Sequence, residues 1–306
     1  MGSGSYSQES YDRYVVDNNV SASSASSNFR NHRISHRTSV ANFNTIGRRQ
    51  NVNIQKAGQA IGVREFRENE EHPVSTPVII ALDVTGSMRN TPHKMLTEQF
   101  PKIMNALYDK GVPNPQIMFM AIGDCYYDDY PVQATQAESD PEKLLPQLQE
   151  FVLEGGGGGN GGESYSYAHI VAGYHTETDA WYKRHQKGFL ITIGDEPNLK
   201  EVPGSCLQND LGYENGARTI TAVEALEKAR EQYDVYHIHV NDASHRFDSS
   251  WYELLGEDHV KRCNSVNVAD MIVDIITSHL DTVAEAPAET SVEVHTEDKP
   301  FDMHPA

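Results

Sequence analysis

Short apolar runs alternate with amphipathic helical patterns along the middle of the chain, and this alternation most constrains the fold. Each run is nearly continuous in apolar residues, as is typical of strands buried on both faces of a sheet. The runs lie at 78–82, 116–122, 188–194 and 234–240. Strands that alternate with helices indicate an α/β fold. We therefore expect a doubly wound, mostly parallel central sheet with helices on both faces.

Apolar residues at helical spacing predict the covering helices. These helices are expected at 93–110, 141–153, 163–174, 220–229 and 268–280. Pro101 should kink or divide the first of them, and Asp140 followed by Pro141 should begin the second. The remaining segments predict two short outer strands at 132–135 and 260–266 and a long loop at 197–216.

Composition divides the chain into four parts. Residues 1–60 are rich in Ser, Asn and Arg and show no apolar periodicity, so we expect a flexible, low-complexity basic arm. Residues 61–73 are expected to be a linker. Residues 74–282 should form the folded domain, and residues 283–306 an acidic flexible tail.

The charge of the chain is unevenly distributed. The formal net charge is −19, and residues 1–60 carry +4, which leaves −23 on residues 61–306. A body of this sign repels a phosphate backbone and attracts cations. The charge therefore argues against nucleic acid as the main ligand.

The sequence also bears on the compartment. No apolar run approaches the roughly 18 residues of a membrane helix, and the first residues lack the apolar stretch of a secretory signal. Cys125, Cys206 and Cys263 are far apart and odd in number, which argues against a disulfide framework. We therefore expect a cytoplasmic protein that does not cross a membrane.

An oxygen-rich sequence directly follows the first predicted strand. It is Asp83-Val-Thr85-Gly-Ser87, whose alternate spacing lets one carboxylate and two hydroxyls converge on one turn. Such hard oxygen ligands suit Mg²⁺ or Mn²⁺ rather than Zn²⁺.

Two later segments carry similar chemistry. The Gly-rich stretch 155–162 contains Asn160 and leads into Glu163, and Asp195-Glu196 follows the strand predicted at 188–194. Ligands of open α/β sheets bind at the carboxyl ends of strands. The three segments together therefore predict a site at one edge of the sheet.

The first segment resembles the DxSxS element of von Willebrand factor type A domains, in the form DxTGSM found among intracellular members. The resemblance covers residues 74–282 and implies a metal-ion-dependent adhesion site. By this resemblance Asp83, Thr85, Ser87 and Asp195 would be metal ligands. The family places a Thr in its second loop, where this chain offers Asn160, Glu163 or Ser164 instead, and Glu196 stands beside the third-loop Asp.

Two further groups of residues have competing interpretations. The segment after the second strand contains Asp124, Tyr126, Tyr127, Asp128 and Asp129, and is either a solvated acidic loop or a rim that contacts a partner. His237 and His239 share one face of a strand and are either a metal pair or buried core residues; the latter interpretation is favoured because no third soft ligand is evident.

Three functions remain in competition. The preferred hypothesis is a non-enzymatic module whose Mg²⁺ or Mn²⁺ ion docks an exposed Asp or Glu of a protein partner. The family resemblance suggests adaptors, including those of AAA-class ATPases, and the basic arm could pair with the acidic body of another copy. The alternatives are a metal-dependent phosphohydrolase, whose second Asp is replaced by Thr85 here, and nucleic-acid binding through the arm.

Overall fold

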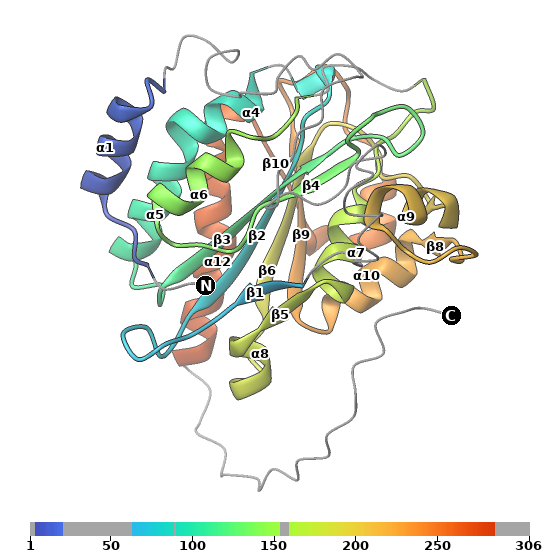
Figure 1. Ribbon diagram of the computed structural model, residues 1–306. Coiled ribbons are helices and arrows are strands. Elements are labelled where there is room, and N and C mark those ends of the chain that lie inside the picture. Colours follow the sequence, from blue (N-terminus) through green and yellow to red (C-terminus); the bar gives the residue numbers. More distant parts are fainter. Residues whose placement is uncertain (1–3, 21–62, 89, 154–158, 285–306) are drawn as a thin grey trace, which may run out of the picture.

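The computed structural model describes residues 4–20, 63–88, 90–153 and 159–284, which form a central sheet between two layers of helices (Figure 1). Six strands lie in the order β10–β9–β6–β2–β3–β4, and all neighbours are parallel except β3 and β4. Their bounds are Thr76–Asp83 (β2), Pro115–Ile122 (β3), Val132–Ala134 (β4), Gly188–Gly194 (β6), Tyr233–Val240 (β9) and Val260–Cys263 (β10). This is a doubly wound order, so the predicted fold class is confirmed.

The apolar runs form the central strands because both faces of the sheet are covered. Every residue of β2, β3 and β6 is buried. Ile79 and Ile80 illustrate the alternation, since each belongs to the core on a different face. β2 lies between β3 and β6, so the loops that follow these three parallel strands open at the same edge of the sheet.

Two sets of helices cover the two faces (Figure 1). One set comprises α1 (Gln8–Asp17), α5 (Phe100–Asp109), α6 (Pro141–Leu148) and α12 (Val268–Ala284). The other comprises α7 (Ser166–Tyr174), α9 (Gly204–Leu211), α10 (Ala222–Arg230) and α11 (Ser250–Leu255). The predicted N-cap of α6 is confirmed, because the Asp140 side chain accepts a hydrogen bond from the Glu142 N–H.

Several predicted boundaries were wrong. The helix expected over 93–110 begins at Thr91 instead, although its predicted division near Pro101 is confirmed: it consists of α4 (Thr91–Lys94), a π-helical turn (Met95–Gln99) and α5. The loop expected at 197–216 contains α9 and β7 (Glu201–Val202), which pairs with β8 (Ile220–Thr221). α11 was not predicted at all. These elements are short, so too few residues repeat in each for a periodic pattern to reveal it.

The prediction of a flexible arm is wrong for the first described residues. Residues 8–17 form α1, which packs beside α5 and α6 (Figure 1). Its attachment depends on three buried tyrosines, Tyr6, Tyr11 and Tyr14, rather than on an aliphatic stripe. Tyr6 and Tyr11 pack against Phe100, and the Tyr14 hydroxyl donates to the Gln149 side chain. Residues 21–62 and the predicted tail after 284 lie outside the described residues.

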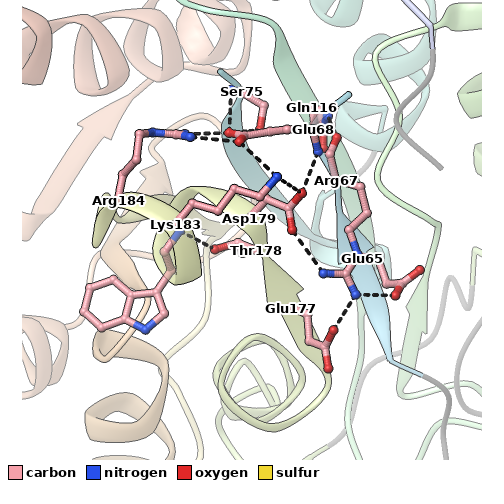
Figure 2. Close-up of polar contacts among 11 residues, drawn as sticks. Glu65, Arg67, Glu68, Ser75, Gln116, Glu177, Thr178, Asp179, Lys183 and Arg184 are labelled. Carbon is pink, nitrogen blue, oxygen red and sulfur yellow. Dashed lines mark hydrogen bonds and ion pairs between the residues drawn. The ribbon is translucent and has the colours of Figure 1, made fainter. Parts of the chain in front are cut away.

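The expected linker is also part of the fold. Within it, β1 (Arg64–Phe66) pairs in parallel with β5 (Thr176–Thr178), and Phe66 is fully buried. A network of ion pairs joins the residues around these strands to α8 (Asp179–Arg184), as Figure 2 shows. Arg67 contacts Glu65, Glu177 and Asp179. The segment was missed because it holds few apolar residues and its charged side chains form ion pairs with residues distant in the sequence.

Candidate metal centre

The loop that follows β2, the first loop of the candidate site, turns back on itself at the end of the strand. Asp83 is the last residue of the strand, and its Oδ1 accepts hydrogen bonds from the Thr85 N–H at 2.8 Å and the Thr85 hydroxyl at 2.6 Å. A single 3₁₀ turn, Gly86–Met88, then brings the Ser87 hydroxyl back to 3.1 Å from that of Thr85. The sequence-predicted convergence of Asp83, Thr85 and Ser87 is what the structure has.

The loop that follows β6, the third loop of the candidate site, brings Asp195 to the side chains of the first loop. β6 pairs with β2. Asp195 follows β6 directly and is fully buried. Its Oδ1 accepts a hydrogen bond from the Ser87 hydroxyl at 2.7 Å. Its Oδ2 accepts from the backbone N–H groups of Ser244 and His245, both at 2.9 Å. The carboxylate is therefore fixed, with one oxygen on the backbone and the other facing the first loop.

The Thr85 and Ser87 hydroxyls each donate their proton to a carboxylate. Thr85 donates to Asp83 and Ser87 donates to Asp195, so no proton remains for the 3.1 Å contact between the two hydroxyl oxygens. Each oxygen instead presents lone pairs to the space beside the other. Octahedral ligands about 2.1 Å from Mg²⁺ lie about 3.0 Å apart, so this spacing fits two ligands of one small cation.

The second loop of the candidate site precedes α7 and contributes a buried acid, Glu163. Glu163 is 4% exposed, and hydrogen bonds from its N–H to Pro197 and from Leu199 to its carbonyl hold its backbone. Burial, together with the charges of Asp83 and Asp128, raises the pKa of the Glu163 carboxyl to about 10. Its Oε2 has no hydrogen-bond partner among the described residues. The carboxyl is therefore protonated near pH 7 without metal, and a bound cation would stabilise its charged form.

The other second-loop candidates lie elsewhere. Asn160 is exposed, and among the described residues no contact joins it to the oxygen cluster. Ser164 is buried, but its hydroxyl accepts a hydrogen bond from the Cys125 N–H at 2.9 Å. Glu196 is directed towards His245, with 2.8 Å between its Oε1 and the ring Nδ1. Of the second-loop residues, the geometry therefore favours Glu163 as the one to face the cluster.

Burial disfavours the charged form of Asp83 more strongly than its hydrogen bonds favour it. Burial raises the pKa of Asp83 to about 7, although hydrogen bonds from Thr85 and Tyr165 act in the opposite direction. The hydroxyl of Tyr165 donates to Asp83 Oδ2 at 2.7 Å. This contact joins residues 82 positions apart, and no local pattern in the sequence could have revealed it. The Ser244–His245 backbone contacts were missed for the same reason.

The acidic loop after β3 divides into buried and exposed residues. Asp124 and Asp128 are buried, and Asp128 Oδ2 accepts from the Asp124 N–H at 2.7 Å, so neither forms a solvated rim. Tyr126 and Tyr127 are 49% and 60% exposed, and Asp129 is half-buried. The rim interpretation therefore survives for the two tyrosines, and the solvated-loop interpretation is wrong for the two buried acids.

His237 and His239 lie in the core. The His237 ring stacks on Trp251 with 3.6 Å between centroids, and its Nδ1 lies 3.0 Å from the Thr192 hydroxyl. His239 packs edge-on against Phe247. The described part of the chain contains no group of three or more His, Cys, Asp or Glu side chains placed to hold a metal. The candidate centre differs from such groups because hydroxyls supply two of its oxygens.

The chain is similar in fold to several solved proteins. It aligns with the pilus adhesin SpaC from Lactobacillus rhamnosus GG (TM-score 0.46, 9% identity, 71% of this chain and 31% of that one). It also aligns with the vWF domain of the type V pili tip protein Mfa5 from Porphyromonas gingivalis (TM-score 0.43, 11% identity, 71% of this chain and 98% of that one). A third alignment is with proximal thread matrix protein 1 from the mussel byssus (TM-score 0.41, 12% identity, 71% of this chain and 48% of that one). These matches concern the fold alone, and the chain spans about a third of the SpaC chain.

No family model and no curated protein matches the sequence. Among the described helices, none combines the length and the apolar character needed to cross a membrane.

Proposed function

We propose that this chain is a protein-interaction module that binds Mg²⁺ or Mn²⁺ at the loops after β2 and β6, and that the ion docks a carboxylate of a partner. The observation that carries the proposal is the 3.1 Å contact between the hydroxyl oxygens of Thr85 and Ser87, whose protons are both directed to carboxylates. Two facing oxygens without a proton between them repel each other, and a cation between them turns that repulsion into attraction.

The proposed ligands follow from the lone pairs that remain available. Thr85 Oγ1, Ser87 Oγ and Asp195 Oδ1 would hold the ion, with Asp83 behind them. Glu163 is the proposed second-loop acid, because its buried Oε2 lacks a partner. A bound divalent cation would offer an open coordination position to an anionic ligand. Asp83 cannot readily act as a nucleophile, since both of its oxygens accept hydrogen bonds, and this disfavours the phosphohydrolase.

The surroundings of the site fit a protein ligand. Tyr126 and Tyr127 are exposed on the loop after β3, the strand that pairs with β2 along its whole length. Exposed tyrosines are common at the centre of protein interfaces. We propose that they pack against residues flanking the partner's Asp or Glu. The family resemblance suggests an AAA-class ATPase as the partner. The charge distribution suggests a second copy of this chain.

The first experiment is a calorimetric titration of Mn²⁺ and Mg²⁺ into the metal-free full chain and into Ser87→Ala. Ser278→Ala is the matched control, because among the described residues its hydroxyl bonds within α12, to the Ile275 carbonyl oxygen. We expect binding by the wild type and the control, and at least tenfold weaker binding by Ser87→Ala. Equal binding by all three proteins, or no binding by any, would refute the metal site.

The second experiment tests docking. A random peptide library is selected on the immobilised chain in Mg²⁺ and eluted with a chelator. We expect the eluted peptides to share an Asp or Glu at one position, and Ser87→Ala to retain none of them. Eluted peptides with no common acid would contradict carboxylate docking while leaving the metal site intact.

A further inference from the structure

Tyr165 is the residue that immediately precedes α7, and it is fully buried on the side of the sheet that α7 covers. Its hydroxyl donates to Asp83 Oδ2 at 2.7 Å. A carboxylate has about four lone-pair sites. The Thr85 N–H, the Thr85 hydroxyl and the Tyr165 hydroxyl occupy three of them, which leaves about one on Asp83 for the candidate centre.

Gly194 provides the space for this contact. A Cβ atom built on Gly194 would lie 1.8 Å from the Tyr165 hydroxyl oxygen and 2.6 Å from Cζ of the ring. Any other residue at 194 would therefore displace the ring. Gly194 directly precedes Asp195, so the third loop both supplies an acid to the centre and admits the group that holds the first-loop acid.

Other aromatic residues hold the Tyr165 ring in place. The ring meets His237 edge-on with 5.6 Å between centroids and Trp251 with 5.3 Å. Trp251 in turn donates from its indole N–H to the carbonyl oxygen of Glu196 at 3.0 Å. Tyr165 is thus packed between the first and third loops, and its hydroxyl has little freedom to leave Asp83.

We infer that Tyr165 is a positioning residue of the metal centre: its hydroxyl, admitted by Gly194, fixes the Asp83 carboxylate so that Thr85 directs its proton to Asp83 and its lone pairs outwards. This inference rests on the proposed function for its metal-binding consequence, but not for the positioning of Asp83 itself. Residues that orient metal ligands typically change metal affinity by 10–100-fold when they are removed.

The test compares Tyr165→Phe with Tyr167→Phe in Mn²⁺ calorimetry. Tyr167 is an equally buried tyrosine two residues away, and its hydroxyl donates to Asp210 instead. We expect Tyr165→Phe to bind Mn²⁺ at least tenfold more weakly than the wild type, and Tyr167→Phe to bind it as the wild type does. A merely structural hydroxyl would lower the melting temperature of both variants without separating their affinities.

Gly194→Ala is a second, independent variant, because it keeps Tyr165 but displaces its ring. We expect the same loss of Mn²⁺ affinity. Wild-type affinity in either folded variant, Tyr165→Phe or Gly194→Ala, would overturn the inference.

A metal-free measurement separates this inference from the proposed function. The Thr85 amide donates to Asp83 Oδ1, so its ¹⁵N–¹H NMR signal reports the orientation of that carboxylate. Should the wild type bind no Mn²⁺, the proposed function fails, and the NMR signal alone decides the role of Tyr165. A shift in Tyr165→Phe but not in Tyr167→Phe supports the inference, whereas no shift in Tyr165→Phe overturns it.

Discussion

The hydroxyl of Tyr11 donates a hydrogen bond to the carbonyl oxygen of Thr97, with 3.1 Å between the two oxygens and 86 positions between the residues. It also lies 3.2 Å from the carbonyl oxygen of Leu96. Pro101 explains why these carbonyls are available. It has no N–H to donate to Thr97 four residues earlier, and the Phe100 N–H is directed to Met95 across the π-helical turn. α1 therefore docks where Pro101 and the π-helical turn together leave two backbone acceptors available.

Tyr11→Phe tests this relationship. The substitution removes the hydroxyl and leaves the buried carbonyl oxygen of Leu96 and the half-buried one of Thr97 with one donor fewer, while the ring packing against Phe100 is kept. We expect a loss of about 1 kcal/mol in the free energy of unfolding, measured by urea denaturation. Tyr127→Phe is the control, because that side chain is 60% exposed, and its stability should match the wild type. Equal stability of the two variants would argue against a role for the hydroxyl.

The ion pairs of Glu68 predict an acid-sensitive contribution to stability (Figure 2). Burial alone would raise the pKa of Glu68, but hydrogen bonds from Arg184 and from the Ser75 N–H outweigh it and lower the pKa below its ordinary value. The side chain is 2% exposed, and Arg184 contacts both of its oxygens. Since the folded pKa is lowered, this contribution is complete above the unfolded pKa of about 4.3 and is lost as the pH falls through the folded pKa.

Glu68→Gln should therefore be less stable than the wild type at pH 7, and the difference should shrink as the pH falls below about 4. Urea denaturation across pH 3–7 measures both quantities. Glu70→Gln, two residues along the chain at an exposed position, should follow the wild type at every pH. A Glu68→Gln difference that stays constant with pH would show that the ion pairs contribute nothing.

Glu163→Gln should lower the metal affinity of the chain without lowering its metal-free stability. Burial and the neighbouring acids raise the pKa of the Glu163 carboxyl to about 10, so the group is protonated near pH 7 without metal, and the neutral amide of the same shape removes no charge. We expect an unchanged melting temperature at pH 7 without metal, and Mn²⁺ affinity at least tenfold lower. Calorimetry and thermal unfolding give the two values. Unchanged Mn²⁺ affinity would exclude Glu163 as the second-loop ligand, and another group would have to supply that ligand.

The central sheet could be predicted from the sequence because its strands are continuous apolar runs. The first and third loops could be placed because Asp83 and Asp195 directly follow two such runs. α1 could not be predicted, since its attachment uses tyrosines and a carbonyl freed by Pro101 rather than a periodic apolar face. The strand β1 was missed because charged partners distant in the sequence hold the segment around it.

The same distinction holds within the site. Asp83, Thr85 and Ser87 lie within five consecutive residues, so their convergence follows from local spacing. Tyr165 meets Asp83 from 82 positions away, and Ser244 meets Asp195 from 49 positions away, so only the folded chain brings them together. In the second loop, the sequence could not decide whether Asn160, Glu163 or Ser164 is the candidate ligand. The structure distinguishes them, because Asn160 is exposed, the Ser164 hydroxyl accepts from the Cys125 N–H, and Glu163 is buried.

Thr85 allows the hydroxyl itself to be tested as a metal ligand. Thr85→Val keeps the shape of the side chain but removes the oxygen that bonds to Asp83 and faces Ser87, whereas Thr85→Ser keeps that oxygen. We expect calorimetry to show Mn²⁺ affinity at least tenfold lower for the valine variant and close to wild type for the serine variant. Thr85 is buried, so thermal unfolding without metal must accompany each titration to separate misfolding from ligand loss. If both folded variants bind Mn²⁺ equally well, the 3.1 Å pair of hydroxyls is a hydrogen-bonded turn rather than half of a cation site.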